Sequence, residues 1–177
     1  INYRILQNDS QTASAYLTLF SRLMRRIMAD SRRDFNRLSD EIETIRLYVQ
    51  VESMRFSRTI EFKTSIEPGI DPGQIWIPSL ILHTFLENSV WQSMLPRAID
   101  SVLNLSVRQQ LNTYHIVLED NGFVAGPPRS AYAREESGMS MAVERLRLLN
   151  QCYGVDMQIS TGGAEVPEAP GTRVDLS

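Results

Sequence analysis

The stretch Ile77–Pro96, IPSLILHTFLENSVWQSMLP, decides how the rest of the chain is interpreted. Its apolar residues recur at the i, i+3, i+4 spacing of one helix face, which predicts a helix from about Ser79 to about Met94. Glu87 and Asn88 stand side by side in this helix. Burying an adjacent carboxylate and carboxamide is costly unless both find partners, and both offer the oxygen ligands that Mg²⁺ prefers. They are therefore the first candidates for a site.

Alone, a Glu-Asn pair is more often a solvated helix edge than a site. Two later patterns change that balance. Leu118–Gly122, LEDNG, ends a predicted strand in a turn, and Ser137–Met141, SGMSM, opens a predicted helix behind a loop rich in glycine and proline. This order of a Glu-Asn helix, a strand ending in Asp-x-Gly, a loop and a glycine-led helix resembles the nucleotide-binding fold of histidine kinases and related ATPases.

The upstream sequence narrows the resemblance. Leu38–Ile42 (LSDEI), Tyr48-Val49 and Glu52–Phe56 (ESMRF) are similar to the L-x-x-E-I, Y-hydrophobic and E-x-x-R-F elements of the LytS-like class of bacterial sensor histidine kinases. The likeness runs from near Ile1 to Val174. It implies a two-component signalling protein whose catalytic domain is of the GHKL ATPase type.

The composition argues against several other classes of protein. The chain has 177 residues, of which 42% are hydrophobic and 22% charged, as in a soluble globular protein of one to two domains. A net charge of −3 provides no general basic field for nucleic acid. One cysteine, Cys152, excludes an internal disulfide, and two histidines without cysteine partners predict no zinc site. The longest apolar run is shorter than the roughly 18 residues that span a bilayer.

The sequence periodicities predict an α+β fold. Helical spacing predicts helices over Ser10–Met28, Leu38–Glu52 and Met139–Cys152, with a polar break at Asp30–Arg37. The strands expected from alternation and from β-branched or aromatic runs are Thr59–Glu67, Ser101–Arg108, Thr113–Glu119, Val155–Ser160 and Thr172–Leu176. Strands that include an antiparallel hairpin, mixed with helices, indicate a two-layer α/β sandwich. By the resemblance this sandwich is of the histidine-kinase (Bergerat) type, preceded by two helices.

We expect two regions in the chain. Residues 1–57 are predicted to be a helical remnant of the dimerisation and phosphoacceptor segment, and residues 58–177 the ATP-binding catalytic domain. An αα-hairpin packed on its own domain is the alternative for the first region. In the class, the phosphoacceptor histidine lies in an N-P-H-F-x-F-N motif before the position of Ile1, and neither His83 nor His115 takes its place. The resemblance thus implies a chain truncated just after that motif and unable to autophosphorylate alone.

The resemblance also implies roles for single residues. Asn88 would ligate the Mg²⁺ that bridges the ATP phosphates, and Glu87 would polarise the attacking histidine, because phosphoryl transfer needs mainly positioning and charge neutralisation. Asp120 would accept a hydrogen bond from the adenine amino group, and Gly122 would leave room for the base. Without the other motifs, Asp120 to Gly122 would be interpreted as a plain turn.

Two further residues complete the expected ATP site. Gly138, at the start of a helix, would let backbone N–H groups approach the phosphates, although an ordinary glycine between loop and helix is an equal alternative. Thr172 belongs to a late Gly-Thr pair that in the class lies near the adenine pocket. Arg145 could reach a phosphate, but surface arginines usually do not.

Some positions depart from the class. Gln92 and Ser93 stand where the class usually has His-Gly, and Val124 replaces a glycine after Asp-x-Gly. A non-glycine residue at a position that needs positive φ costs about 1–2 kcal/mol, which is roughly a tenfold loss of affinity. A degenerate, non-catalytic dimerisation and signalling module with weak or no nucleotide binding is therefore the alternative to a working kinase.

The expected partners follow from the resemblance. They are a response regulator, which would receive the phosphoryl group on an aspartate, and a second copy of the chain, bound through the N-terminal helices. No nucleic acid is expected, because only the arginines between Arg22 and Arg37 favour it. Membrane attachment is expected only through segments outside this chain, which would be the cytoplasmic portion of a bacterial inner-membrane sensor.

Overall fold

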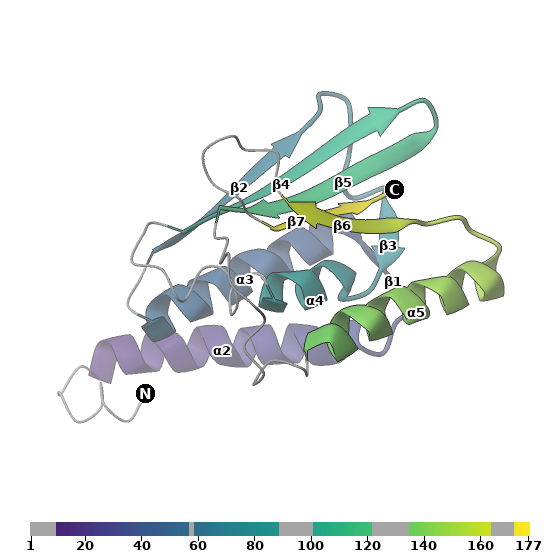
Figure 1. The fold of residues 1–177 in the computed structure, drawn as a ribbon. Helices are drawn as coiled ribbons and strands as arrows, with labels where there is room; N and C mark the ends of the chain where they lie inside the picture. Colours follow the sequence, from purple (N-terminus) through teal and green to yellow (C-terminus); the bar gives the residue numbers. More distant parts are fainter. Residues whose placement is uncertain (1–9, 57–58, 89–100, 122–134, 164–171) are drawn as a thin grey trace.

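A five-stranded sheet covers a layer of helices in the computed structural model (Figure 1), which describes residues 10–56, 59–88, 101–121, 135–163 and 172–177. The helices are α2 (Ser10–Asp30), α3 (Leu38–Phe56), α4 (Ile81–Asn88) and α5 (Glu135–Tyr153), and the strands are β1 (Phe35–Arg37), β2 (Ile60–Ile66), β3 (Trp76–Pro78), β4 (Ser101–Gln110), β5 (Thr113–Asp120), β6 (Ile159–Gly163) and β7 (Thr172–Leu176). Helices α3, α4 and α5 lie under the sheet, and α2 lies on the far side of α3. The expected two-layer α+β sandwich is confirmed.

The order of strands in the main sheet is β2-β4-β5-β7-β6. β4 and β5 form the expected antiparallel hairpin, and β7 pairs antiparallel with both β5 and β6. β2 instead runs parallel to β4. Parallel neighbours need a crossover connection, and the segment between these two strands includes β3 and α4. The helix that carries the Glu-Asn pair therefore belongs to the crossover of the sheet.

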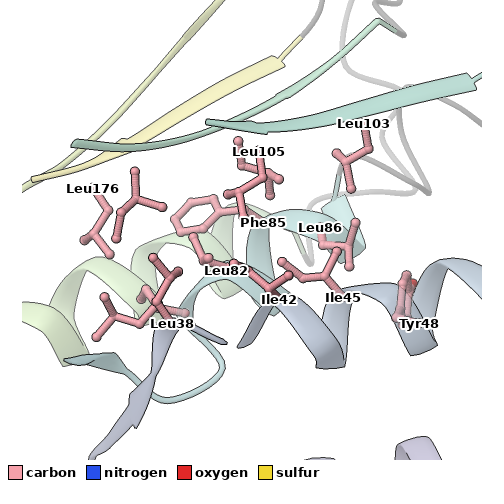
Figure 2. Packing of buried hydrophobic residues seen from close by; sticks show 14 of the residues in the cluster. Leu38, Ile42, Ile45, Tyr48, Leu82, Phe85, Leu86, Leu103, Leu105 and Leu176 are labelled. Atoms are coloured by element: carbon pink, nitrogen blue, oxygen red, sulfur yellow. The ribbon is translucent and has the colours of Figure 1, made fainter. Parts of the chain in front are cut away.

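The core lies between the sheet and the helices α3 and α4 (Figure 2). Leu82, Phe85 and Leu86 of α4 are almost completely buried, and their spacing places them on one face of the helix. Figure 2 shows Phe85 lying between α4 and the sheet, beside Leu105 of β4. Burying a side chain of this size completely stabilises a fold by roughly 1.5–3 kcal/mol. This face therefore fixes α4 against the sheet.

The structure corrects several predicted boundaries. α5 begins at Glu135, four residues before the predicted start at Met139. β6 begins at Ile159 instead of Val155. The sequence-based prediction missed the small antiparallel sheet of β1 and β3, because a strand of three residues is too short to show a period. The proposed division at residues 57 and 58 stays a prediction.

The junction between β3 and α4 is held by side chains from other elements. Leu80 has a φ of +60°, a conformation that costs a non-glycine residue roughly 1–2 kcal/mol. Its N–H donates to Oε1 of Glu41 in α3 at 2.7 Å. The carbonyl of Ser79 accepts from Nη1 of Arg145 in α5 at 2.7 Å, and the N–H of Ser79 donates to the carbonyl of Asp34 at 3.0 Å. These contacts tie the start of α4 to three other parts of the chain.

We expect Leu82→Ala to destabilise the fold by about 2–5 kcal/mol, because it leaves a cavity under the sheet. Leu111→Ala is the matched control, since Leu111 in the β4–β5 turn is 97% exposed, and its effect should stay within about 0.5 kcal/mol. Urea denaturation of both variants measures the difference. Equal effects of the two substitutions would contradict the position of α4.

We also expect stability to depend on the ionisation of Glu41. Burial raises the pKa of Glu41 from 4.5 to about 7. Because the folded state then holds the proton more tightly than the unfolded state, the free energy of unfolding falls as the pH rises from about 4.5 to about 7. This carboxyl group should account for a loss of about 3 kcal/mol.

Glu41→Gln should remove that loss, and Glu43→Gln, at a more exposed position of the same helix, should keep it. Urea denaturation between pH 4.5 and pH 8 gives the comparison. Burial also raises the pKa of Asp30 and of Glu52, so the difference between the wild type and Glu41→Gln measures Glu41. The same pH dependence in both proteins would show that Glu41 titrates normally.

Candidate functional site

The Glu-Asn pair lies at the end of α4, at residues 87 and 88. The neighbouring residues Phe85 and Leu86 are buried in the core, whereas the side chain of Glu87 is 54% exposed. A half-exposed carboxylate is thus carried by a helix that is fixed along its other face. The side chain of Asn88, like Gln92 and Ser93, lies outside the described part of the chain.

His83 is a functional candidate that the sequence-based analysis did not assign. It precedes Glu87 by one helical turn, and its Nε2 lies 3.4 Å from Oε1 of Glu87. Its ring, which is buried, packs edge-on against Tyr48 of α3, with 4.9 Å between the ring centres. The hydrogen bond from His83 lowers the pKa of Glu87, against the effect of partial burial. Glu87 is therefore ionised at neutral pH and able to accept a further hydrogen bond. The i, i+4 spacing of the two residues was the available signal.

The E-x-x-R element of α3 contributes a second carboxylate near Glu87. Glu52 is buried, and Nη1 of Arg55 lies 3.3 Å from its Oε1. Burial is the main cause that raises the pKa of Glu52, Arg55 opposes the rise, and the negative charge of Glu87 adds to it. The charges of Glu52 and Glu87 therefore interact across the contact between α3 and α4.

Asp120 is the last residue of β5, the middle strand of the sheet, and is only 2% exposed. The next residue, Asn121, is held by Val102: its N–H donates to the carbonyl of Val102, and its Oδ1 accepts from the N–H of Val102 at 2.9 Å. The predicted strand ending is confirmed. Gly122 and Val124 lie outside the described residues.

Thr172 begins β7, and the register places it near Asp120. The last pair between β5 and β7 is Glu119 with Arg173, so Thr172 stands one position further, level with Asp120 on the neighbouring antiparallel strand. The fold thus brings together two residues that are far apart in the sequence. The side chain of Thr172 lies outside the described part of the chain.

Gly138 lies inside α5, where it is the fourth residue. The prediction that the glycine stands at the start of this helix was wrong by three residues. Acidic residues are favoured in the first turn of a helix, and Glu135 and Glu136 there explain the earlier start. Arg145, further along α5, donates to the carbonyls of Ser79 and Arg33. Its guanidinium group therefore stabilises the backbone before α4.

No group of three or more His, Cys, Asp or Glu side chains in the described part of the chain could hold a metal ion. Among the same residues, no helix combines the length and the apolar character needed to cross a membrane.

Comparisons with known proteins agree on one family. Residues 1–60 match the family model for histidine kinases. The sensor histidine kinase BtsS of Escherichia coli K12 is 25% identical over 156 residues, which cover 88% of this chain and 26% of BtsS. The sensor protein LytS of Enterococcus faecalis is 21% identical over 175 residues, which cover 92% of this chain and 29% of LytS. The chain thus spans little more than a quarter of the length of these relatives.

The solved cytoplasmic segment of the histidine kinase QseC has a similar fold, with a TM-score of 0.50 and 18% sequence identity over 94% of this chain and 93% of that segment. This likeness supports the fold, and the matches in sequence support the class. The matches in sequence therefore make this chain similar to sensor histidine kinases of the LytS-like class.

Proposed function

We propose that this chain is the catalytic part of a two-component sensor kinase that binds Mg-ATP and transfers the γ-phosphoryl group to a histidine outside this sequence. The observation that carries the proposal is the position of Glu87. Its ionised, half-exposed carboxylate is held by His83 on a helix that the core fixes in place. Such a group is suited to orient an attacking imidazole.

The residues fit ATP and Mg²⁺ by their chemistry. Mg²⁺ commonly takes only one or two protein ligands and completes its coordination with phosphates and water. A single carboxamide at Asn88, with no larger cluster of ligands in the described residues, is consistent with that pattern. The buried carboxylate of Asp120 is an acceptor, which matches the amino group of adenine.

The bound Mg²⁺ would supply neutralisation of the phosphate charge. Asn88 would hold it, and Glu87 would orient and polarise the incoming histidine side chain. Asp120 and Thr172, level on neighbouring strands, would bind the adenine end of the nucleotide. Gly122 and Gly138 would leave space for the base and the phosphates.

We also infer how the whole protein assembles, starting from helix α2. The exposed side chains of Leu17, Phe20 and Met28 follow one stripe of α2, beside the side that packs on α3. An uncovered apolar stripe supports a homodimer through this helix.

A response regulator would be the phosphoryl acceptor. Segments outside this chain would anchor the protein in the inner membrane, with this part in the cytoplasm. Nucleic acid has no role in the proposal.

Calorimetric titration of this chain with Mg-ADP and with a non-hydrolysable ATP analogue tests the pocket. We expect micromolar binding that Asn88→Ala weakens at least about tenfold, because a metal ligand is lost. Asn104→Ala is the control, since Asn104 is an exposed asparagine of β4 and its removal should change nothing. Absence of heat up to millimolar nucleotide would favour the non-catalytic signalling module, in which Gln92, Ser93 and Val124 have disabled the pocket.

Sedimentation velocity tests the dimer. Leu17→Glu should convert the dimer to a monomer, because it places a charge on the proposed interface. Leu148→Glu is a matched control on α5, where the leucine is 47% exposed compared with 46% for Leu17, and it should leave the dimer intact. A monomeric wild type at high concentration would refute dimerisation through α2.

A further inference from the structure

One face of α3 interacts with the segment from Leu80 to Glu87 at three places. Glu41, Tyr48 and Glu52 follow one another at intervals of seven and four residues, which places them on the same side of α3. Glu41 accepts a hydrogen bond from Leu80 and Tyr48 packs against the ring of His83. The charge of Glu52 interacts with that of Glu87. These α3 residues therefore meet the start, the middle and the end of the segment that carries the candidate site.

The contact between Glu41 and Leu80 is the most specific of the three. Glu41 has no exposed surface, and its Oε1 accepts from the N–H of Leu80 at 2.7 Å. Its other carboxyl oxygen is buried and has no hydrogen-bond partner among the described residues. Burying a carboxyl group is unfavourable, so the fold retains it at a cost in stability. Its carboxyl group accepts from the backbone N–H group of Leu80, the residue directly before α4.

That residue has the unusual backbone conformation. Leu80 has a φ of +60°, and α4 begins with the next residue. Ser79, directly before it, is held on both sides by Arg145 and by Asp34. The hydrogen bond to Glu41 stabilises the one peptide group that connects this fixed turn to the helix. A change in the conformation of Leu80 would shift the start of α4 relative to the packing of its buried face.

Such a shift would reach Glu87 and Asn88, because they are only two helical turns away. Because the regular backbone of a helix moves as one unit, a change in direction at its first residue also moves its last residue. Misplacement of catalytic groups by about 1 Å can reduce rates about a hundredfold. The contacts of His83 with Tyr48 and Glu87 hold the middle of the helix but do not set where it begins.

We propose that Glu41 is a positioning residue, whose carboxyl group fixes the start of α4 and thereby the placement of Glu87 and Asn88. This inference rests on the proposed function, since it assigns Glu41 to that same site. Because Glu41 has no exposed surface, it would act through α4 and not by contact with the nucleotide.

The test measures the affinity of this chain for ADP with and without Mg²⁺. Glu41→Met removes the acceptor for the Leu80 N–H at similar volume, and Glu41→Gln keeps an acceptor oxygen. We expect Glu41→Met to weaken Mg-ADP binding about tenfold, with Mg²⁺-free ADP binding unchanged, because Asp120 is on another element. Glu41→Gln should restore Mg-ADP binding to within about twofold of the wild type. Glu43→Met, the same substitution at a more exposed position of α3, should match the wild type.

Glu41→Asp is the variant to measure if Glu41→Met does not fold. It shortens the side chain by one methylene, which withdraws the carboxyl group from Leu80 and keeps its polarity. It should show the same selective loss of Mg-ADP binding. A folded Glu41→Met or Glu41→Asp protein with wild-type Mg-ADP affinity would overturn the proposal, as would equal losses with and without Mg²⁺. A wild type that binds no nucleotide would instead overturn the proposed function, and the role of Glu41 with it.

Discussion

Helix α4 is held in place by the burial of one face against the sheet, and the arrangement of the candidate site depends on this. Leu82, Phe85 and Leu86 fill the space between α3 and the sheet (Figure 2). The next residues along the helix are Glu87 and Asn88, at the end of the described helix. Because protein interiors are packed like crystals of small molecules, α4 cannot turn on its axis without opening cavities under β4. Glu87 and the backbone of Asn88 are thus carried by a helix that its buried face fixes in place.

The surroundings of Glu87 show how a carboxylate can be kept ionised next to another carboxylate. Glu52 lies close enough for their charges to interact, and the hydrogen bond from His83 lowers the pKa of Glu87. Arg55 opposes the effect of burial on Glu52. Each of these residues belongs to α3 or α4, so the contact between the two helices sets the charge at the site. A movement of α3 would change this charge, which is a physical route from the helical segment to the proposed nucleotide site.

The sequence predicted those elements that are long enough to show a hydrophobic period. The three long helices and the β4–β5 hairpin follow from it, and so does the position of Asp120 at a strand end. The backbone of Leu80 could not be foreseen, because a leucine with positive φ is stabilised by contacts from Glu41 and Arg145, which are distant in the sequence. The contact of His83 with Tyr48 was hidden for the same reason. The start of α5 was missed because the glycine was taken as a boundary.

Backbone amide NMR of this chain during titration with Mg-ADP tests whether the ends of α4 and β5 form one nucleotide pocket. We expect the largest chemical-shift changes on Glu87 and Asn88 at the end of α4 and on Asp120 and Asn121 at the end of β5. Those segments are separate in the sequence, so their joint response would define one pocket. Changes confined to the open cleft of about 450 Å³ between the ends of β2 and β4, which Ser65 and Arg108 help to line, would contradict it. So would an unchanged spectrum at saturating nucleotide.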